Sequence, residues 1–122
     1  MRNLSLFEAD RLTMEDSLTM TADSLNAYGG SYRHWALAYS GGKDSTALVA
    51  AVTHLIDAGR VAPPESLTIL YCDTRQELPP LQRAAMRILN SLEGRGYRTG
   101  VVMPEMDDRF YVYMLGRGVP AP

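Results

Sequence analysis

The sequence predicts an α/β fold in which helices alternate with the strands of a parallel sheet. Three short apolar runs, at residues 34–39, 67–72 and 98–103, are bounded by glycine, proline or polar residues, as buried strands are. The two stretches between these runs carry apolar residues at helical spacing, and both are long enough to connect parallel strands. The order strand, helix, strand, helix, strand therefore follows for residues 34–103.

Composition bounds the class of protein. The chain has 122 residues, of which 46% are apolar and 21% charged, so we expect one globular domain rather than a disordered segment. No apolar run approaches the ~20 residues that a membrane helix needs, and residues 1–12 lack the apolar core of a signal peptide. We therefore expect a cytoplasmic protein without a membrane partner. A net charge of −2 gives no bulk electrostatic reason to bind nucleic acid.

Residues 8–28 contain neither proline nor glycine and carry a loose apolar stripe at helical spacing. The stripe consists of Met14, Leu18, Thr21 and Leu25. We expect a helix here that ends with Gly29 as its C′ residue and packs on the sheet or on a partner. Residues 1–33 are thus predicted to be an N-terminal helical segment, and residues 34–122 the α/β domain.

The first strand, HWALAY at residues 34–39, runs into a Gly-Gly turn. A helix follows, because apolar residues recur on one helical face and Gly59 ends the pattern. Residues 58–66, AGRVAPPES, have the composition of a loop. The apolar face of the helix consists of Ala47, Leu48, Ala51, Val52, Leu55 and Ile56.

The second strand is LTILYC at residues 67–72, and the third is RTGVVM at residues 98–103. Between them lies the clearest helical stripe in the chain, with Pro79 and Pro80 in its first turn. The stripe consists of Leu81, Ala84, Ala85, Ile88, Leu89 and Leu92.

A last short helix is expected at about residues 107–115, with Phe110 and Tyr111 packed in a core. The full prediction is a three-layer, parallel, doubly wound sheet of the Rossmann-like kind. Three parallel strands alone leave two open edges. We therefore expect either that a second copy or a different protein covers these edges, or that residues 34–122 are the N-terminal portion of a larger domain.

Parallel strands place their strand-to-helix loops at one edge of the sheet, where α/β proteins usually bind ligands. The two loops so placed are SGGKDS, residues 40–45, and CDTRQELP, residues 72–79. The first contains Lys43, the only lysine among 12 basic residues. Glycines let a backbone approach a ligand closely, and the amides at a helix N-terminus together with a lysine attract phosphate. The sequence therefore predicts a phosphate site around Lys43.

A simpler interpretation of the first loop is a tight turn in which Asp44 or Ser45 caps the helix. This explains the glycines and the cap but leaves the single lysine unexplained. The loop is also not a Walker loop, whose lysine is followed by serine or threonine, because Lys43 is followed by Asp44. Phosphate binding is the stronger hypothesis.

SGGKDST resembles the pyrophosphate loop of the PP-loop ATP pyrophosphatase superfamily, also called adenine nucleotide α-hydrolase-like, and the chain resembles its PAPS reductase-like branch. CDTRQELP resembles the D-T-x-x-E-x-P pattern of that branch. The segment RFYVYMLGRGVPAP, residues 109–122, is similar to a segment of the members associated with DNA sulfur modification, or phosphorothioation. The resemblance covers residues 34–122, with the first motif the most specific and the last the least.

The resemblance implies that an adenine nucleotide, ATP, lies across the ends of the first two strands. It implies that the first loop holds the phosphates, that backbone near the strand ends holds adenine, and that residues 73–77 flank the ribose or the acceptor. The phosphate-binding residues would be Ser40, Gly41, Gly42, Lys43, Asp44, Ser45 and Thr46. The residues near adenine would be Ala38, Tyr39 and Cys72, and those on the acceptor side Asp73, Thr74 and Glu77.

In the ATP-using members a nucleophile attacks the α-phosphorus and pyrophosphate leaves, which activates a substrate for sulfur transfer. Lys43, Asp44, Asp73 and Glu77 are the expected catalytic residues, with Asp44 a candidate ligand for Mg²⁺. Two of them have simpler alternatives, Asp44 as a helix cap and Glu77 as an acid favoured near the next helix N-terminus. The expected function is an ATP-dependent enzyme of DNA sulfur modification that reaches nucleic acid through partners.

Two other functions remain open. One is a reductase of the sulfonucleotide PAPS, which needs a nucleophilic cysteine near the C-terminus, and the chain has no cysteine after Cys72. The other is a nucleotide-binding module that is catalytically incomplete without a partner. Cys72 itself is expected to be a small buried residue of the strand rather than a reactive thiolate. A single cysteine also excludes an iron–sulfur cluster built from this chain alone.

Overall fold

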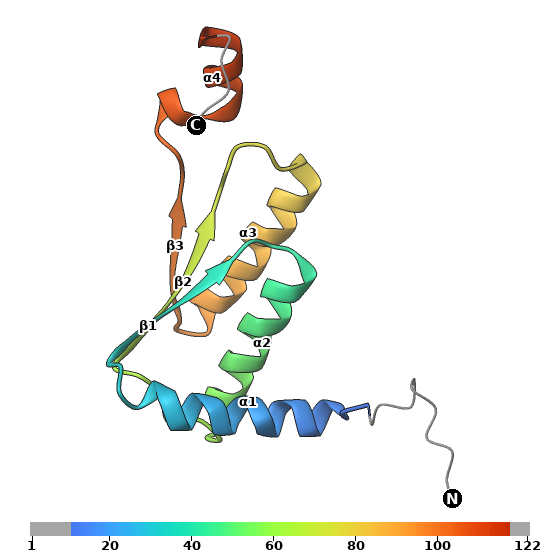
Figure 1. Cartoon of the computed structure of the whole chain (residues 1–122), viewed down its shortest axis with the longest axis vertical. Helices are drawn as coiled ribbons and strands as arrows, with labels where there is room; N and C mark the ends of the chain where they lie inside the picture. Colours follow the sequence, from blue (N-terminus) through green and yellow to red (C-terminus); the bar gives the residue numbers. More distant parts are fainter. Residues whose placement is uncertain (1–10, 118–122) are drawn as a thin grey trace, which may run out of the picture.

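The computed structural model describes residues 11–117. The three strands form one parallel sheet in the order β1-β2-β3. The predicted α/β fold, with helices alternating with parallel strands, is confirmed. The predicted start of the first helix at residue 8 and the tail residues 118–122 lie outside the described residues. The elements are α1 (Met14–Gly29), β1 (His34–Tyr39), α2 (Lys43–Asp57), β2 (Ser66–Cys72), α3 (Pro79–Gly94), β3 (Arg98–Val102), the 3-10 turn η1 (Met106–Asp108) and α4 (Phe110–Arg117) (Figure 1).

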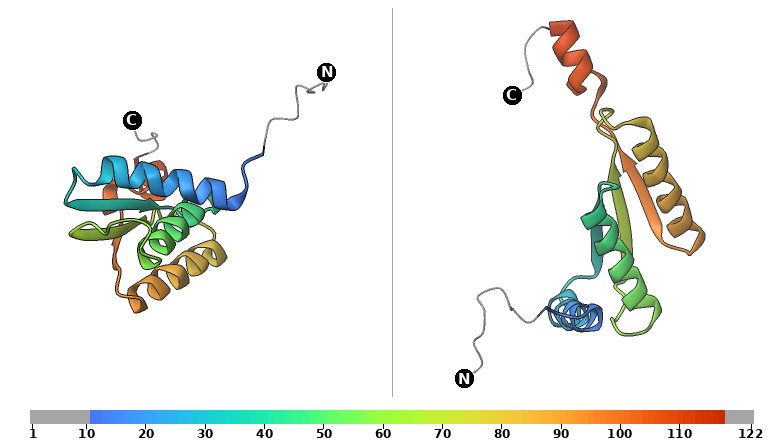
Figure 2. Two further views of the ribbon diagram at one scale, coloured as in Figure 1. Left: turned by 90° about the horizontal axis from the view of Figure 1, so that it is seen from below. Right: turned by 90° about the vertical axis from the view of Figure 1, so that its right-hand side faces the viewer.

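Both crossover helices, α2 and α3, lie on the same face of the sheet (Figure 2). This follows from the topology, because right-handed crossovers that step twice in the same direction place both helices on one side. Tyr39, Ile69 and Tyr71 point into this layer and pack in one cluster with Ala85 and Leu89 of α3. Each of these residues is at most 2% exposed, so the main core lies between the sheet and the helices.

The opposite face of the sheet carries no helix from the described part of the chain (Figure 2). Leu70 and Val102 point to that face and are 36% and 48% exposed. Cys72 points the same way and is exposed, so the prediction of a buried cysteine is wrong. The cause is the alternation of side chains along a strand, because Cys72 follows the inward-pointing Tyr71.

α1 lies at the amino edge of the sheet and runs from near the amino ends of β1 and β2 to beneath the carboxyl end of α2 (Figure 1). Its first turn is fixed by a capping box, in which the side chain of Thr13 accepts from the Asp16 amide and the side chain of Asp16 accepts from the Thr13 amide. Ala22 is buried in a second, smaller cluster with Leu55 and Val61. The helix is therefore held by this cluster, against which Trp35 of β1 also packs, and by polar contacts such as those of Asn26 with the backbone of the loop after α2.

The buried face of α3 is narrower than the predicted apolar stripe, whereas that of α2 is shifted, because Val49 and Thr53 are buried although neither belongs to the predicted stripe. Leu48 and Leu81, both in the predicted stripes, are 47% and 59% exposed because the sheet covers only one side of each helix. The buried residues of the two helices are Val49, Val52, Thr53, Leu55, Ala85, Leu89 and Leu92. None of the helices between residues 11 and 117 combines the length and the apolar character that crossing a membrane would require.

The last described segment differs most from the prediction. Instead of one helix over residues 107–115, the structure has the short turn η1 followed by α4, which begins at Phe110. Phe110 and Tyr111 are 44% and 57% exposed and contact each other edge-to-face, with ring centroids 5.5 Å apart. The prediction that they pack in a core is therefore wrong. α4 packs against η1 and lies beyond the carboxyl edge of the sheet (Figure 1). In this position the sheet does not cover α4.

Candidate functional site

The two loops that carry the sequence motifs lie together at the carboxyl edge of the sheet (Figure 1). Residues 40–42 connect β1 to α2, and residues 73–78 connect β2 to α3. Because β1 and β2 are parallel neighbours, with Tyr39 paired to Tyr71, both loops leave the sheet side by side. The expected placement of both motifs at one edge agrees with this geometry.

The first loop is a tight turn whose shape depends on Gly41 and on two serine hydroxyls. Gly41 has a φ of +82°, in the left-handed region that glycine adopts without strain. Ser45 Oγ accepts a hydrogen bond from the Ser40 amide at 3.1 Å and lies 2.9 Å from Ser40 Oγ. These contacts hold the turn against the first residues of α2.

α2 begins at Lys43 with Gly42 as its N-cap, and no side chain of the cap residue satisfies its first amides. The alternative in which Asp44 or Ser45 caps the helix is therefore wrong. The amide of Thr46 donates to Gly42 O at 3.0 Å, which is the first hydrogen bond of the helical ladder. The amides of Lys43, Asp44 and Ser45 precede that ladder. Such amides, together with the helix dipole, are a ready-made site for an anion.

The side chains around these amides divide into two groups. Lys43 and Asp44 are exposed at the start of the helix. The hydroxyls of Ser45 and Thr46 instead donate to the carbonyl oxygen of Gly42, at 3.3 and 2.6 Å. Ser45 and Thr46 thus shape the loop, whereas the side chains of Lys43 and Asp44 are exposed to solvent beside it.

Asp73 organises the second loop from a buried position, with only 4% of its surface exposed. Its Oδ1 accepts from the Arg75 amide at 2.9 Å, and its Oδ2 accepts from Gln82 Nε2 at 2.8 Å. The Asp73 amide donates to Val102 O at 2.9 Å, which extends the pairing of β2 with β3. With both carboxylate oxygens engaged, Asp73 holds the shape of the loop.

Thr74 and Glu77 close the same loop through a hydrogen bond of 3.0 Å from Thr74 Oγ1 to Glu77 Oε1. The other carboxylate oxygen of Glu77 is buried and has no hydrogen-bond partner among the described residues. The same is true of the hydroxyls of Tyr39 and Tyr71. The two rings lie 5.9 Å apart. Burial, and then the nearby charge of Glu77, raises the pKa of Tyr71, so its hydroxyl stays protonated beneath the loops.

One face of α3 joins the two loops. Gln82 donates to Asp73 in the second loop. Ala85 lies three residues further along the same face, and a Cβ placed on Gly41 would be 2.9 Å from its Cβ. A shift of α3 would therefore move both loops together. Sequence reasoning placed Ala85 in the apolar stripe of this helix but did not predict that Gln82 and Ala85 contact the two loops. The one available signal was a polar side chain, Gln82, within an apolar stripe.

The residues expected near adenine do not gather their side chains on one surface. Tyr39 points into the core and is 2% exposed. Ala38 and Cys72 are exposed on the open face of the sheet. A base at this edge would therefore contact the backbone at the ends of β1 and β2 and the small side chains of Ala38 and Cys72.

Mg²⁺ fits the site only as an ion shared with a ligand. The described residues contain no group of three or more histidine, cysteine or acidic side chains that could hold a metal ion. Asp44 is an exposed carboxylate at the first loop, whereas both oxygens of Asp73 are engaged. Mg²⁺ commonly binds through one or two carboxylates together with substrate phosphates and water. Asp44 can supply such a carboxylate.

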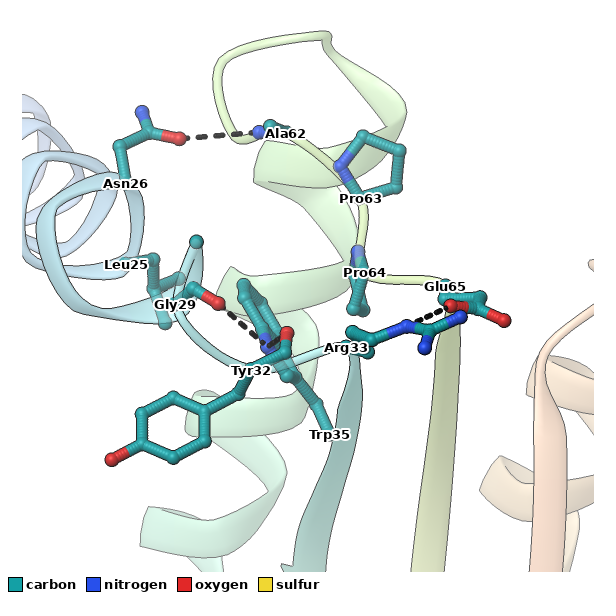
Figure 3. A pocket seen from close by; sticks show the side chains of 11 residues that line it. Leu25, Asn26, Gly29, Tyr32, Arg33, Trp35, Ala62, Pro63, Pro64 and Glu65 are labelled. Atoms are coloured by element: carbon teal, nitrogen blue, oxygen red, sulfur yellow. Dashed lines mark hydrogen bonds and ion pairs between the residues drawn. The ribbon is translucent and has the colours of Figure 1, made fainter.

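A separate hollow of about 220 Å³ lies at the opposite, amino edge of the sheet (Figure 3). Trp35 forms part of its wall, and its Nε1 donates to Gly29 O at 3.3 Å and to Tyr32 O at 3.1 Å. Asn26 Oδ1 accepts from the Ala62 amide at 3.1 Å. Because these polar groups are used within the protein, this part of the molecule anchors α1 to the sheet.

The carboxyl edge thus offers a cradle of backbone amides, with one lysine and one exposed aspartate, beside a second loop that is firmly held. This combination suits a phosphate-bearing ligand. The chain matches no protein-family model and no curated protein.

Proposed function

We propose that this chain binds an adenine nucleotide, ATP in the first place, through residues 40–46 and acts as an enzyme of the PP-loop ATP pyrophosphatase type. The observation that carries the proposal is the start of α2, where a glycine turn leads into a helix without a side-chain cap and the only lysine of the chain is the first helical residue. Three amides, the helix dipole and one ammonium group meet at this point. Such a site suits a diphosphate or triphosphate better than an uncharged ligand.

In the proposed reaction a nucleophile attacks the α-phosphorus and pyrophosphate leaves. Negative charge grows on the departing phosphates, and fixed amides with Lys43 stabilise that charge without rearranging. Bound Mg²⁺, with Asp44 as its protein ligand, supplies further neutralisation of the phosphates. Asp73 and Glu77 keep the second loop in place, which positions the acceptor side of the site.

On the resemblance of residues 109–122 to the members associated with DNA sulfur modification, we propose sulfur transfer in DNA modification, with nucleic acid reached through a partner. The open face of the sheet supports the need for a partner or a further segment, because parallel sheets are normally covered on both faces. A three-layer, doubly wound sheet would carry helices on that face as well. The same observation favours a second candidate function, a nucleotide-binding module without turnover until its partner is present.

Calorimetric titration of the chain with ATP and Mg²⁺, and in parallel with PAPS, tests the proposal. We expect ATP to bind and Lys43→Met to lose binding, with turnover reduced at least ~10²-fold, as for the loss of one preorganised charge stabiliser. Arg33→Met is the matched control, because it also removes a positive charge but lies at the opposite edge in an exposed ion pair with Glu65. That variant should bind ATP like the parent chain.

The outcomes separate the candidates. ATP binding with release of pyrophosphate supports the enzyme, and ATP binding without release supports the module. A preference for PAPS would favour the reductase instead. Equal binding of ATP by the parent and by Lys43→Met would contradict the assignment of the loop.

A further inference from the structure

Arg75 has a backbone conformation that residues with a Cβ rarely adopt. Its φ is +62°, the only positive φ outside glycine among residues 11–117. The conformation is fixed locally, because the Arg75 amide donates to Asp73 Oδ1 at 2.9 Å. Strain of this kind persists where surrounding contacts hold it, and it is concentrated at functional sites.

The guanidinium group of Arg75 can leave its present position at little cost. Its Nη1 lies 3.6 Å from Asp73 Oδ2, which is longer than a hydrogen bond, and the side chain is 45% exposed. Asp73 does not depend on this contact, since Oδ1 accepts from the Arg75 amide and Oδ2 from Gln82 Nε2. Moving the guanidinium group would therefore leave no buried carboxylate oxygen unpaired.

The place of Arg75 suits the charge of a nucleotide. Its loop leaves β2 beside the loop that leads from β1 to Lys43, at the same edge of the sheet. One lysine and one helix dipole carry less positive charge than a triphosphate carries negative charge. A guanidinium group binds phosphate through two parallel hydrogen bonds, which an ammonium group cannot do.

We propose that Arg75 is a second cationic ligand of the nucleotide, and that its guanidinium group moves from Asp73 to the β- and γ-phosphates when the nucleotide binds. The proposal rests on the nucleotide-binding function proposed above and adds a residue that distinguishes nucleotides by their number of phosphates. Glycine would adopt this conformation without strain, so the arginine side chain carries a cost in stability. A phosphate contact accounts for that cost.

Titration of ATP, ADP and AMP into the parent chain and two variants tests the proposal. Arg75→Met removes the guanidinium group and keeps the strained backbone, whereas Arg75→Gly removes both and should unfold at a higher temperature than Arg75→Met. We expect both variants to lose ATP affinity about tenfold, as for one charge-assisted hydrogen-bonding group, and to bind AMP like the parent. Arg33→Met, at the opposite edge, should keep its affinity for ATP.

Other results would overturn the proposal in distinguishable ways. Unchanged ATP affinity in both Arg75 variants, with affinity lost in Lys43→Met, would remove Arg75 from the site and leave the proposed function standing. An equal loss for ATP and AMP would show that Arg75 acts on the adenosine part or on the fold. If neither ATP nor inorganic pyrophosphate binds the parent chain, the proposed function and this inference fail together.

Discussion

Gly41 lies where the first loop passes against α3, and two separate constraints require a glycine there. Its φ of +82° strains any residue with a Cβ. A Cβ would also lie 2.9 Å from the Cβ of Ala85, well inside the ~3.5–4.0 Å at which carbon atoms pack. Gly59 shares only the first constraint, because its φ is +73° and an added Cβ would have no atom within 4 Å. The two glycines therefore separate backbone strain from steric contact.

We expect Gly41→Ala to destabilise the chain more than Gly59→Ala. Gly59→Ala should cost ~1–2 kcal/mol for the left-handed backbone. Gly41→Ala should cost a further ~1–3 kcal/mol for overpacking against α3. Urea unfolding measures the difference as a shift in midpoint at constant slope, and only Gly41→Ala should weaken ATP binding. Equal costs would mean that the loop moves away from Ala85 without penalty.

Residue types predicted the first loop better than the second. Gly41 and Lys43 could be interpreted because a glycine and a lysine at a strand-to-helix turn have a direct physical meaning. The burial of Asp73 could not be predicted, because its partner Gln82 reaches it only through the packing of α3. Cys72 was assigned to the core because a continuous apolar run does not tell which of its residues face inward.

At the scale of elements, Gly29 ends α1 for a reason that the sequence does not display. The prediction of Gly29 as a C′ residue is wrong, because Gly29 is the last residue of the helix and Gly30, with a φ of −60°, is its C-cap. A Cβ on Gly29 would instead lie 2.2 Å from Trp35 Cζ2, so the ring of Trp35 occupies the space of a side chain. At Gly30 the nearest atom to an added Cβ is 3.9 Å away. A contact with β1 thus requires a glycine at the last residue of α1.

Gly29→Ala should displace Trp35 and loosen α1 from the sheet. We expect a loss of ~1–3 kcal/mol, the usual cost of overpacking. Trp35 is the only tryptophan, so its fluorescence should shift to longer wavelength as the indole meets water. Gly30→Ala is the matched control and should stay within ~0.5 kcal/mol of the parent with unchanged emission. Parent-like stability and emission in Gly29→Ala would contradict the contact.

Periodicity predicted that the elements exist but not where they begin and which side they bury. α1 begins at Met14, inside the segment 8–28 predicted to be helical, and the signal for this start was a threonine, Thr13, followed three residues later by Asp16. The segment after β3 is divided by η1, and the aromatic pair Phe110 and Tyr111 is exposed. An apolar pattern shows which residues share a helix face, but it does not supply the surface that the face packs against.

At the scale of the whole molecule, strand order decides which surfaces are covered. β1, β2 and β3 follow one another across the sheet, so both right-handed crossovers place their helices on one face. A doubly wound sheet reverses direction once, which brings later helices to the other face. No such reversal occurs within the described residues. Strand patterns could predict the parallel sheet, but the order of strands depends on pairing partners that periodicity does not identify.

Tyr97 connects elements that are distant in the sequence, because it joins the end of α2 to the start of β3. Its hydroxyl donates to Asp57 Oδ1 at 2.6 Å and to Thr53 O at 3.2 Å. Arg95 pairs with the same carboxylate and lies 5.5 Å from the centroid of the Tyr97 ring. Burial, and then the hydrogen bond to Asp57, raises the pKa of Tyr97 to about 12. The hydrogen bonds from Tyr97 and Arg95 lower the pKa of Asp57.

These two shifts limit stability at opposite ends of the pH scale. An unfolded tyrosine ionises near pH ~10, whereas folded Tyr97 keeps its proton until about 12. The stabilisation from Tyr97 is therefore complete below pH ~10 and is lost as the pH rises through the folded value. The pKa of Asp57 is shifted in the opposite direction, downward. Its contribution to stability is therefore present above pH ~4 and is lost as the pH falls through the lowered pKa.

Tyr97→Phe should therefore change the pH profile of stability as well as its height. At neutral pH we expect a loss of about 1 kcal/mol, for the hydrogen bond to Asp57. Above pH ~10 the decline of the thermal midpoint should be shallower than in the parent. Some decline should remain in the variant, because the pKa of Tyr71 is also raised in the folded state. Tyr28→Phe, at a side chain 74% exposed, is the control and should follow the parent curve. Parallel curves for Tyr97→Phe and the parent would show that the hydroxyl does not link α2 to β3 in solution.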